Sequence, residues 1–342
     1  MVGTGIGAEH GVLIRQAAAL EAVGRLDAVV FDKTGTLTQG EPKVTDVVSV
    51  NHLSEEKLLR LAAAAEMPSE HPLGRAIVDD AREREIEIPE AAEFSAIVGR
   101  GVEATVDGRR VLIGSGRLMS EREVDTSGAE EPLRKLEERG RTALAVAVDG
   151  QVAGVIALAD VAKATAREAV QRLEDLRLDV YLLTGDNRRT ARAVAAELGI
   201  DEVLAEVLPE QKSGEISRLQ AQGRRVAMVG DGINDAPALA QADVGIAIGT
   251  DVAMEAGEIT LVSGDPAGVA RAIILSRRTL AHIKQNLFFS FFYNAAAIPL
   301  AVAGLLNPMI AAAAMAASSV SVVSNSLRLR WYAPRMLDRT GS

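Results

Sequence analysis

Three short apolar runs, each ending in Asp or Thr beside glycine, constrain the fold of this chain more than any other feature. The runs are Ala28–Phe31, Val180–Leu183 and Val226–Val229. Each has the length and composition of a buried strand. One Asp-Gly pair alone would mark a turn. Three such ends predict a doubly wound α/β domain whose polar side chains meet at one sheet edge, where open α/β sheets place their chemistry.

The residues after these runs form three motifs. They are Asp32–Thr36 (Asp-Lys-Thr-Gly-Thr), Thr184–Asp186 (Thr-Gly-Asp) and Gly230–Asp235 (Gly-Asp-Gly-Ile-Asn-Asp). In this order they resemble the phosphorylation motif and the two further signatures of P-type ATPases. The resemblance covers nearly the whole chain, from Val2 to about Arg330. It implies a haloacid-dehalogenase-like phosphorylation domain.

The resemblance also implies a reaction, the transfer of the γ-phosphoryl group of ATP to Asp32 to form an aspartyl-phosphate. Such a transfer depends mainly on positioning and on charge neutralisation. The resemblance implies that Asp32, Asp231 and the Thr34 carbonyl hold Mg²⁺, which prefers hard oxygen ligands. A single lysine is usually a solvated surface group, but Lys212 matches the family's phosphate-binding lysine. The other expected members of the site are Lys33, Thr34, Thr184, Gly185, Asp186, Asn234 and Asp235.

The region from Lys43 to about Gly150 has a different pattern of charged and apolar residues. Charged helical stretches at 54–66 and 74–85 precede short strand-like runs, and the strand-plus-motif pattern resumes only near Val152. The sequence therefore predicts an α+β domain inserted into the first domain. Insertion on two linkers suits hinge motion.

Two segments of the insertion resemble the nucleotide-binding motifs of heavy-metal P-type ATPases. They are Ser69–Gly74, which contains a His-Pro pair, and Gly99–Val102. Each has a plainer reading, because His-Pro pairs end loops and Gly-x-Gly turns are common. Glycine lets the backbone approach a ring or a phosphate closely. The residues expected to bind ATP are Glu66, His71, Gly99, Gly101 and Ser115; related sequences have Asn where this chain has Ser115, so that polar contact is expected to be shorter or lost.

Composition narrows the partners. The net charge of −10 argues against a nucleic-acid partner. The chain has no cysteine, which excludes disulfides and thiolate metal sites.

Two apolar runs near the end of the chain, 287–306 and 309–327, predict a transmembrane hairpin in a lipid bilayer. Basic residues at its outer ends place the catalytic domains in the cytoplasm. Polar residues inside such runs are usually functional, although small ones can simply pack helices. Tyr293, Asn294, Met315 and Ser319 resemble the copper(I)-selective subgroup, which makes Cu⁺ the expected transported ion.

The expected layout follows from these segments: a stalk helix at 1–24, phosphorylation domain at 25–42 and 152–275, nucleotide-binding domain at 43–151, a second stalk at 276–286, the hairpin at 287–327 and a tail at 328–342. The resemblance further implies an actuator domain and upstream membrane helices, as partners missing from this chain. The expectation is therefore the catalytic portion of an ATP-driven heavy-metal transporter, truncated and unable to transport by itself.

Two alternatives stay open. A soluble phosphatase of the haloacid dehalogenase superfamily would share the nucleophilic Asp and the downstream Lys and Asp. Such enzymes usually carry a second Asp two residues after the nucleophile, where this chain has Thr34. The other alternative is a regulatory nucleotide-binding fragment without turnover.

Overall fold

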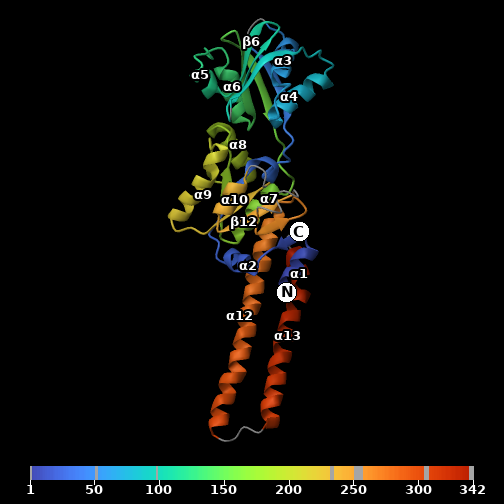
Figure 1. Cartoon of the computed structure of the whole chain (residues 1–342), viewed down its shortest axis with the longest axis vertical. Helices are drawn as coiled ribbons and strands as arrows, with labels where there is room; N and C mark the ends of the chain where they lie inside the picture. Colours follow the sequence, from blue (N-terminus) through green and yellow to red (C-terminus); the bar gives the residue numbers. More distant parts are fainter. Residues whose placement is uncertain are drawn as a thin grey trace. The chain divides into compact units, whose positions relative to one another are not determined.

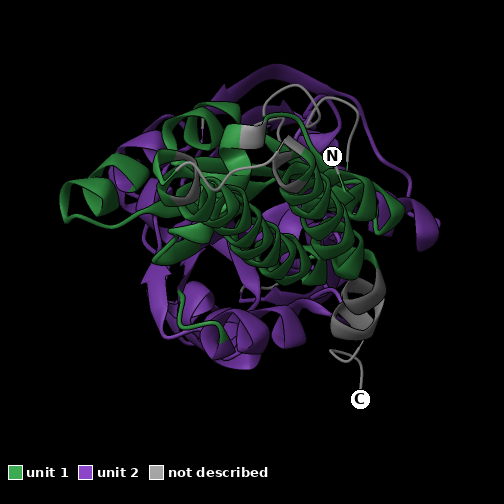
Figure 2. Ribbon diagram, turned by 90° about the horizontal axis from the view of Figure 1, so that it is seen from below, with its two compact units in different colours: residues 1–29, 176–178, 216–342 green, residues 30–175, 179–215 purple. Residues whose placement is uncertain are grey.

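The computed structural model describes residues 2–50, 53–97, 99–231, 235–249, 257–303 and 308–338. The chain divides into two compact units, shown in different colours in Figure 2. Unit 1 comprises residues 1–29, 176–178 and 216–342, and unit 2 comprises residues 30–175 and 179–215. Each unit is therefore assembled from segments that are distant in the sequence.

An antiparallel sheet of six strands forms the inserted part of unit 2. Its order is β3 (Lys43–Ser49), β8 (Gln151–Ala159), β7 (Thr142–Val148), β6 (Arg109–Gly114), β5 (Gly101–Val106) and β4 (Ala91–Ile97). Every neighbouring pair runs antiparallel. The predicted insertion is therefore confirmed as a separate sheet.

Helices cover both faces of this sheet (Figure 1). On one face lie α3 (Glu55–Glu66) and α4 (Pro72–Glu83), whose Leu58 and Ile77 are fully buried against the sheet. On the other lie α5 (Gly116–Glu121) and α6 (Glu130–Glu138), with Met119 fully buried. Successive side chains of a strand point to opposite faces of the sheet. Because helices cover both faces, apolar side chains on either face are buried in a hydrophobic core.

The rest of unit 2 is built on parallel strands. β2 (Ala28–Asp32), β9 (Asp179–Leu183) and β10 (Glu202–Leu204) follow one another in the sheet. Every residue of β2 is buried, as its apolar run predicts. The helices between these strands are α7 (Ala166–Asp175) and α8 (Arg188–Leu198). The sequence predicts a helix over 160–176, but α7 begins only at Ala166, because residues 160–163 contact the loop that follows β2.

Unit 1 contains its own set of adjacent strands, in the order β1 (Val12–Ile14), β13 (Ile259–Leu261), β12 (Val244–Ile248) and β11 (Val226–Gly230). β11, β12 and β13 are parallel, and β1 is antiparallel to β13. The helix α10 (Ala236–Gln241) follows β11, and α9 (Lys212–Ala221) precedes it.

The stalk helix predicted at 1–24, whose residues 7–24 have an amphipathic pattern, is divided in the structure. α1 (Val2–Glu9) ends before Gly11, β1 follows, and α2 (Ala17–Gly24) begins only afterwards. Gly11 has a φ of +72°, a conformation that glycine adopts readily and that ends a helix. The carbonyl of Gly11 also accepts a hydrogen bond from the Val262 N–H, which continues the pairing of β1.

Two long helices, α12 (Ala267–Val302) and α13 (Pro308–Asp338), form a hairpin in unit 1 (Figure 1). Polar side chains join them: Asn286 donates to Ser326 Oγ at 2.9 Å, Asn325 donates to Asn286 Oδ1 at 2.9 Å, and Tyr293 OH lies 3.2 Å from Ser321 Oγ. The predicted hairpin therefore forms.

The predicted crossing of a bilayer by this hairpin is not found. Within the described residues, no helix combines the length and the apolar character that spanning a membrane requires. A spanning helix needs about 20 predominantly apolar residues. The helical hairpin itself is confirmed, and its crossing of a bilayer stays a prediction.

Candidate active site

Asp32 ends the buried strand β2, and its carboxylate is the centre of the candidate site. The residue is 5% exposed. Its Oδ1 pairs with Lys212 Nζ at 2.6 Å, and its Oδ2 accepts a hydrogen bond from the Thr34 N–H at 3.1 Å. An isolated buried carboxylate would be strongly destabilising. The ammonium group of Lys212, itself 9% exposed, therefore compensates the charge of Asp32.

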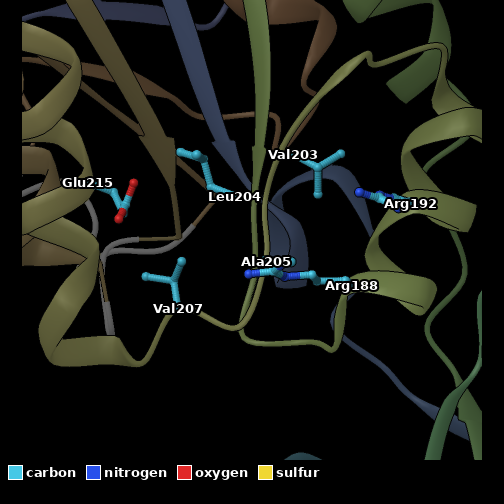
Figure 3. Close-up of a pocket in the computed structure, with 7 residues that line it drawn as sticks. All are labelled: Arg188, Arg192, Val203, Leu204, Ala205, Val207 and Glu215. Carbon is cyan, nitrogen blue, oxygen red and sulfur yellow. The ribbon is translucent and has the colours of Figure 1, made fainter.

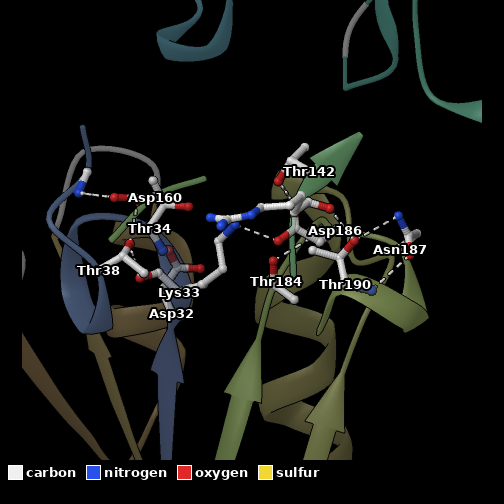
Figure 4. A network of polar contacts seen from close by, with 12 residues as sticks. Asp32, Lys33, Thr34, Thr38, Thr142, Asp160, Thr184, Asp186, Asn187 and Thr190 are labelled. Carbon is white, nitrogen blue, oxygen red and sulfur yellow. Dashed lines mark hydrogen bonds and ion pairs between the residues drawn. The ribbon is translucent and has the colours of Figure 1, made fainter. Parts of the chain in front are cut away.

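The turn Lys33–Leu37 follows Asp32, and its first residue, Lys33, pairs with a different carboxylate. Gly35 has a φ of +73°, which lets the chain reverse without strain. Lys33 is buried and its Nζ donates to Asp186 Oδ2 at 2.5 Å (Figure 4). Two lysines and two carboxylates thus form two ion pairs, the buried pair of Lys212 with Asp32 and the partly buried pair of Lys33 with Asp186.

Thr184, Gly185 and Asp186 follow β9 and form a tight turn. The Asp186 N–H donates to Thr184 Oγ1 at 3.1 Å. Asp186 Oδ1 accepts from Thr142 Oγ1, in the first residue of β7, at 3.3 Å. The loop after Asp32, residues 33–40, is named the phosphorylation loop. Asp186 therefore contacts both this loop, through Lys33, and the inserted domain, through Thr142 (Figure 4).

Asp160 and Lys163 hold the same loop from the other side. Asp160 accepts from Thr38 Oγ1 at 2.5 Å and from the Gly40 N–H at 3.0 Å. Lys163 Nζ donates to the Gly35 carbonyl at 2.7 Å. The sequence analysis missed both residues. A signal was present, because Asp160 directly follows the apolar strand β8 just as Asp32 follows the apolar run Ala28–Phe31, but no glycine marks it.

The third motif lies in unit 1. Asp231 follows the wholly buried β11 and is half-buried, and Asp235 is 1% exposed at the start of α10. A Cβ at Gly230 would lie 2.5 Å from Asp235 Oδ2, so this position requires glycine. Asn234 lies outside the described residues. The approach of Asp231 and Asp235 to Asp32 stays a prediction.

Glu66 is a buried carboxyl group at the end of α3. It is 5% exposed, and within the described part of the chain its Oε2 has no hydrogen-bond partner. Burial raises the pKa of Glu66, and a hydrogen bond with Ser69 offsets part of this rise. A Cβ at Gly74 would lie 2.4 Å from Glu66 Oε2. The close approach of α4 to this carboxyl group therefore depends on glycine.

His71 begins α4 as its N-cap. Its Nδ1 accepts from the Leu73 N–H at 3.2 Å, and Pro72 occupies the first helical position. This bond places the proton of the neutral ring on Nε2. The His71 ring is exposed, yet partial desolvation by the residues around it lowers the pKa of His71. The neutral ring can therefore present its face and its Nε2–H to a ligand.

The Gly99–Gly101 turn brings backbone segments into close contact. Gly101 has a φ of +155°, and a Cβ there would lie 2.0 Å from the Ile113 carbonyl oxygen. Gly99 has a φ of +68°. Ser115 Oγ accepts from the Leu118 N–H at 3.3 Å, as the N-cap of α5. The hydroxyl group of Ser115 therefore already has a structural role as the cap of α5.

A cavity of about 310 Å³ opens elsewhere on unit 2 (Figure 3). It is lined by Arg188 and Arg192 of α8, by Glu215, and by small and apolar residues, which are Val203, Leu204, Ala205 and Val207. None of the predicted site residues lines it. This cavity is therefore distinct from the Asp32 centre.

Two of the four hairpin residues predicted to contact the transported ion make hydrogen bonds within the hairpin. Tyr293 bonds to Ser321, and Asn294 donates to the Ser290 carbonyl of its own helix at 2.9 Å. Met315 is 73% exposed and Ser319 is also exposed. Across the described ranges, no group of three or more His, Asp or Glu side chains is arranged to hold a metal ion.

The sequence was compared with models of known protein families. A family model for haloacid dehalogenase-like hydrolases matches residues 26–243, more than half of the chain. The chain belongs to the haloacid dehalogenase-like hydrolase family. This membership agrees with the position of Asp32 at the end of a buried strand.

Relatives narrow the class further. A copper-exporting P-type ATPase of Bacillus subtilis (strain 168) is 52% identical over 332 residues, which are 96% of this chain and 41% of the relative. A probable copper-exporting P-type ATPase V of Mycobacterium tuberculosis (strain ATCC 25618 / H37Rv) is 56% identical over 335 residues, 97% of this chain and 44% of the relative. The chain thus spans less than half the length of these relatives.

Solved structures agree. A zinc-transporting PIB-type ATPase in the E2.Pi state superposes with a TM-score of 0.71 at 40% identity, over 96% of this chain and 54% of the other. The catalytic domain of the CPx-ATPase CopB-B gives a TM-score of 0.61 at 29% identity, over 78% of this chain and 96% of the other. The resemblance to the C-terminal portion of heavy-metal P-type ATPases is therefore confirmed.

Proposed function

We propose that this chain is the catalytic portion of a heavy-metal P-type ATPase, in which Asp32 takes the γ-phosphoryl group of ATP. The observation that carries the proposal is the buried pair of Lys212 and Asp32 at 2.6 Å. A lysine in this place compensates the charge of the nucleophile before the reaction. It also offers a cation to the phosphoryl oxygens, whose charge must be stabilised during transfer.

In the proposed reaction, an oxygen of the Asp32 carboxylate attacks the γ-phosphorus while the bond to the β–γ bridging oxygen of ATP breaks. The products are an aspartyl-phosphate and ADP. Thr34, through its N–H, and Thr184, through its hydroxyl, are proposed to orient the oxygens around Asp32. Lys33 holds Asp186 in place, at 2.5 Å.

A magnesium ion fits the chemistry of the proposed donors. Asp32, Asp231 and the Thr34 carbonyl offer hard oxygen atoms of the kind Mg²⁺ binds, and no soft ligand is among them. When bound, Mg²⁺ neutralises charge on the phosphates. Asn234 and Asp235 are proposed to orient the metal and the phosphate.

ATP is proposed to bind in the inserted domain. The buried Oε2 of Glu66 can accept a hydrogen bond from the amino group of adenine, and the exposed ring of His71 can stack on the base. The Gly99–Gly101 turn offers close backbone approach. Ser115 is proposed to add at most a short contact, because its hydroxyl already caps α5.

Copper(I) is the proposed cargo of the full-length protein. The curated relatives are named as copper exporters, whereas the neighbour of known structure is named as a zinc transporter. The thioether of Met315 suits a soft ion such as Cu⁺. The hairpin by itself is proposed to hold the ion weakly, since one thioether with hydroxyl and amide oxygens makes a poor Cu⁺ site.

A membrane location of the full-length protein is part of the same proposal. Large apolar side chains of the hairpin are exposed, among them Phe288 at 63%, Phe291 at 69% and Val302 at 84%. Such surface is rare on a protein surrounded by water. Further helices or lipid are proposed to cover it, and sedimentation with liposomes would test this: recovery of the chain only in the supernatant would contradict it.

The phosphatase alternative is weaker on one observation. The residue two positions after Asp32 is Thr34, whose N–H caps the Asp32 carboxylate and whose side chain cannot act as a general acid. Stable phosphorylation of Asp32 therefore fits this site better than rapid hydrolysis of a phosphate ester.

The experiment that tests the proposal is labelling with [γ-³²P]ATP and Mg²⁺. The chain should incorporate label that hydroxylamine removes, as expected for an acyl phosphate. Asp32→Asn should abolish the label, whereas Asp27→Asn, which changes the carboxylate just before β2, should retain it. Label that resists hydroxylamine, or that persists in Asp32→Asn, would contradict the proposal.

A further inference from the structure

The segment by which the inserted domain returns to the parallel strands makes a set of contacts that the proposed reaction does not use. Its helix α6 ends at Glu138, and β7 begins at Thr142. Glu137 near the end of α6, Arg141 in the connection and Thr142 at the start of β7 all contact the residues that follow Thr184-Gly185. These contacts lie within unit 2, between the inserted domain and the start of α8.

Glu137 makes the strongest of these contacts. Its Oε1 accepts a hydrogen bond from Asn187 Nδ2 at 2.9 Å, and its Oε2 pairs with an amino group of Arg189 at 2.8 Å. The Glu137 side chain is 13% exposed, so its bond with Asn187 is partly shielded from water, whereas its partner Arg189 is 58% exposed. Charge-assisted bonds of this kind are among the stronger hydrogen bonds.

Asn187 connects Glu137 to the catalytic turn. Its Oδ1 caps α8 by accepting from the N–H groups of Arg189 and Thr190, while its amino group donates to Glu137. Both ends of the amide are thus fixed. Asn187 directly follows Asp186, which binds Lys33, the residue next to Asp32.

Two further bonds repeat the connection. Thr190 Oγ1 donates to the Arg141 carbonyl at 2.9 Å, and Thr142 Oγ1 donates to Asp186 Oδ1 at 3.3 Å. Of the side chains making these contacts, Glu137 alone joins a charged group of the inserted domain to the turn. It is therefore the residue whose removal should loosen the arrangement most.

We propose that Glu137 is a positioning residue for phosphoryl transfer: by holding Asn187 and Arg189, it keeps Asp186 and the Lys33–Asp186 pair in the orientation that the phosphorylation loop requires, and it ties that turn to the domain that carries ATP. The proposal rests on the proposed function of Asp32. It predicts an effect on the transfer step and none on ATP affinity, because Glu137 lies on α6 and the proposed ATP ligands lie on other elements.

The test compares single-turnover phosphorylation at saturating [γ-³²P]ATP with the affinity for a non-hydrolysable ATP analogue. Glu137→Ala should slow phosphorylation about tenfold and leave the dissociation constant within twofold. Glu137→Gln, which keeps the shape and an acceptor for Asn187, should slow it less. Glu138→Gln is the matched control, because the neighbouring Glu138 pairs only with the exposed Arg134 among the contacts described for it, and it should change neither quantity.

A double-mutant cycle separates positioning from general destabilisation. If Glu137 acts through Arg189, then Glu137→Ala with Arg189→Ala should be about as slow as Glu137→Ala alone. Unchanged rates in both Glu137 variants, or a loss of affinity that matches the loss of rate, would overturn the proposal while leaving Asp32 as the nucleophile. Absence of label in the parent chain would overturn the proposed function, and this inference with it.

Discussion

The phosphorylation loop and the nucleotide-binding region of this chain are built in opposite ways. Around Asp32, the charged side chains described are paired before any substrate is present: Lys212 with Asp32 and Lys33 with Asp186. In the inserted domain, Glu66 is buried with an unbonded oxygen and His71 is exposed. The first region is held by its own charges, while the second presents groups that a ligand would satisfy.

This difference separates two kinds of requirement. Asp32 must keep one geometry, since phosphoryl transfer depends on positioning. The nucleotide region must admit and release its ligand, so it keeps part of its bonding capacity open. Changes around Asp32 should therefore cost stability, whereas relieving the unpaired group in the nucleotide region should increase it.

Lys212→Met should have the largest effect. It leaves the buried charge of Asp32 uncompensated, which costs about 3–5 kcal/mol for a buried pair. Urea denaturation measures the loss. The double variant Lys212→Met with Asp32→Asn should recover much of it, because neither charge remains. A single variant as stable as the parent would show that Lys212 does not compensate Asp32.

Gly101→Ala should follow. The position combines a φ of +155° with a Cβ 2.0 Å from the Ile113 carbonyl, so backbone strain of about 1–3 kcal/mol and a shift of β6 are expected. Gly108→Ala is the control, since Gly108 has a φ of +73° but nothing within 4 Å of the added Cβ. Equal losses for the two variants, by thermal denaturation, would remove the argument from close approach.

Glu66→Gln should stabilise the chain by about 1 kcal/mol at neutral pH, because it removes a charge from a buried, partly unbonded site. Burial raises the folded-state pKa of Glu66 above its unfolded value. The stability contributed by Glu66 is thus fully present below about pH 4.3, the ordinary pKa of Glu, and is lost as pH rises through the folded-state value. Denaturation curves of the parent and the variant should converge at low pH.

The exposed Glu56 provides the control for that experiment, since Glu56→Gln should shift stability little at any pH. A Glu66→Gln variant less stable than the parent at pH 7 would mean that the carboxylate has a compensating partner. The nucleotide region would then resemble the phosphorylation loop after all.

The smallest effect is expected at Ser115. Because its hydroxyl caps α5, Ser115→Ala should cost about 1 kcal/mol, whereas Ser115→Asn should be nearly neutral, since Asn caps helices as well as Ser does. Calorimetry should show ATP affinity equal or tighter in Ser115→Asn. A marked loss would show that the likeness to the family misleads at this position.

Some features of the fold and of the candidate site could be predicted from the sequence, and others could not. The strand before Asp32, the strand before Thr184 and the helix closed by Gly199 were predictable, because local apolar patterns and turn residues determine them. The pairing of Lys212 with Asp32 was expected only through the family likeness. No local pattern specifies a contact between residues so far apart in the chain.

The parts that could not be predicted depend on tertiary contacts. Residues 160–163 had helical character, yet Asp160 and Lys163 are used to hold the loop after Asp32. The segment 7–24 had amphipathic character, yet its middle pairs with β13 as a strand. Glu137 is one of several charged residues between 130 and 141, and its partners Asn187 and Arg189 lie about 50 positions further along the chain. In each case a distant partner outweighs local preference.

Hydrogen–deuterium exchange, measured with and without a non-hydrolysable ATP analogue and Mg²⁺, tests the central contrast most directly. Amides of the loop after Asp32, residues 33–40, should be protected already in the free chain and change little on binding. Amides of residues 66–74 and 99–101 should exchange faster and gain protection with the nucleotide. A loop at 33–40 that is unprotected until nucleotide binds, with no change at 66–74, would contradict the account.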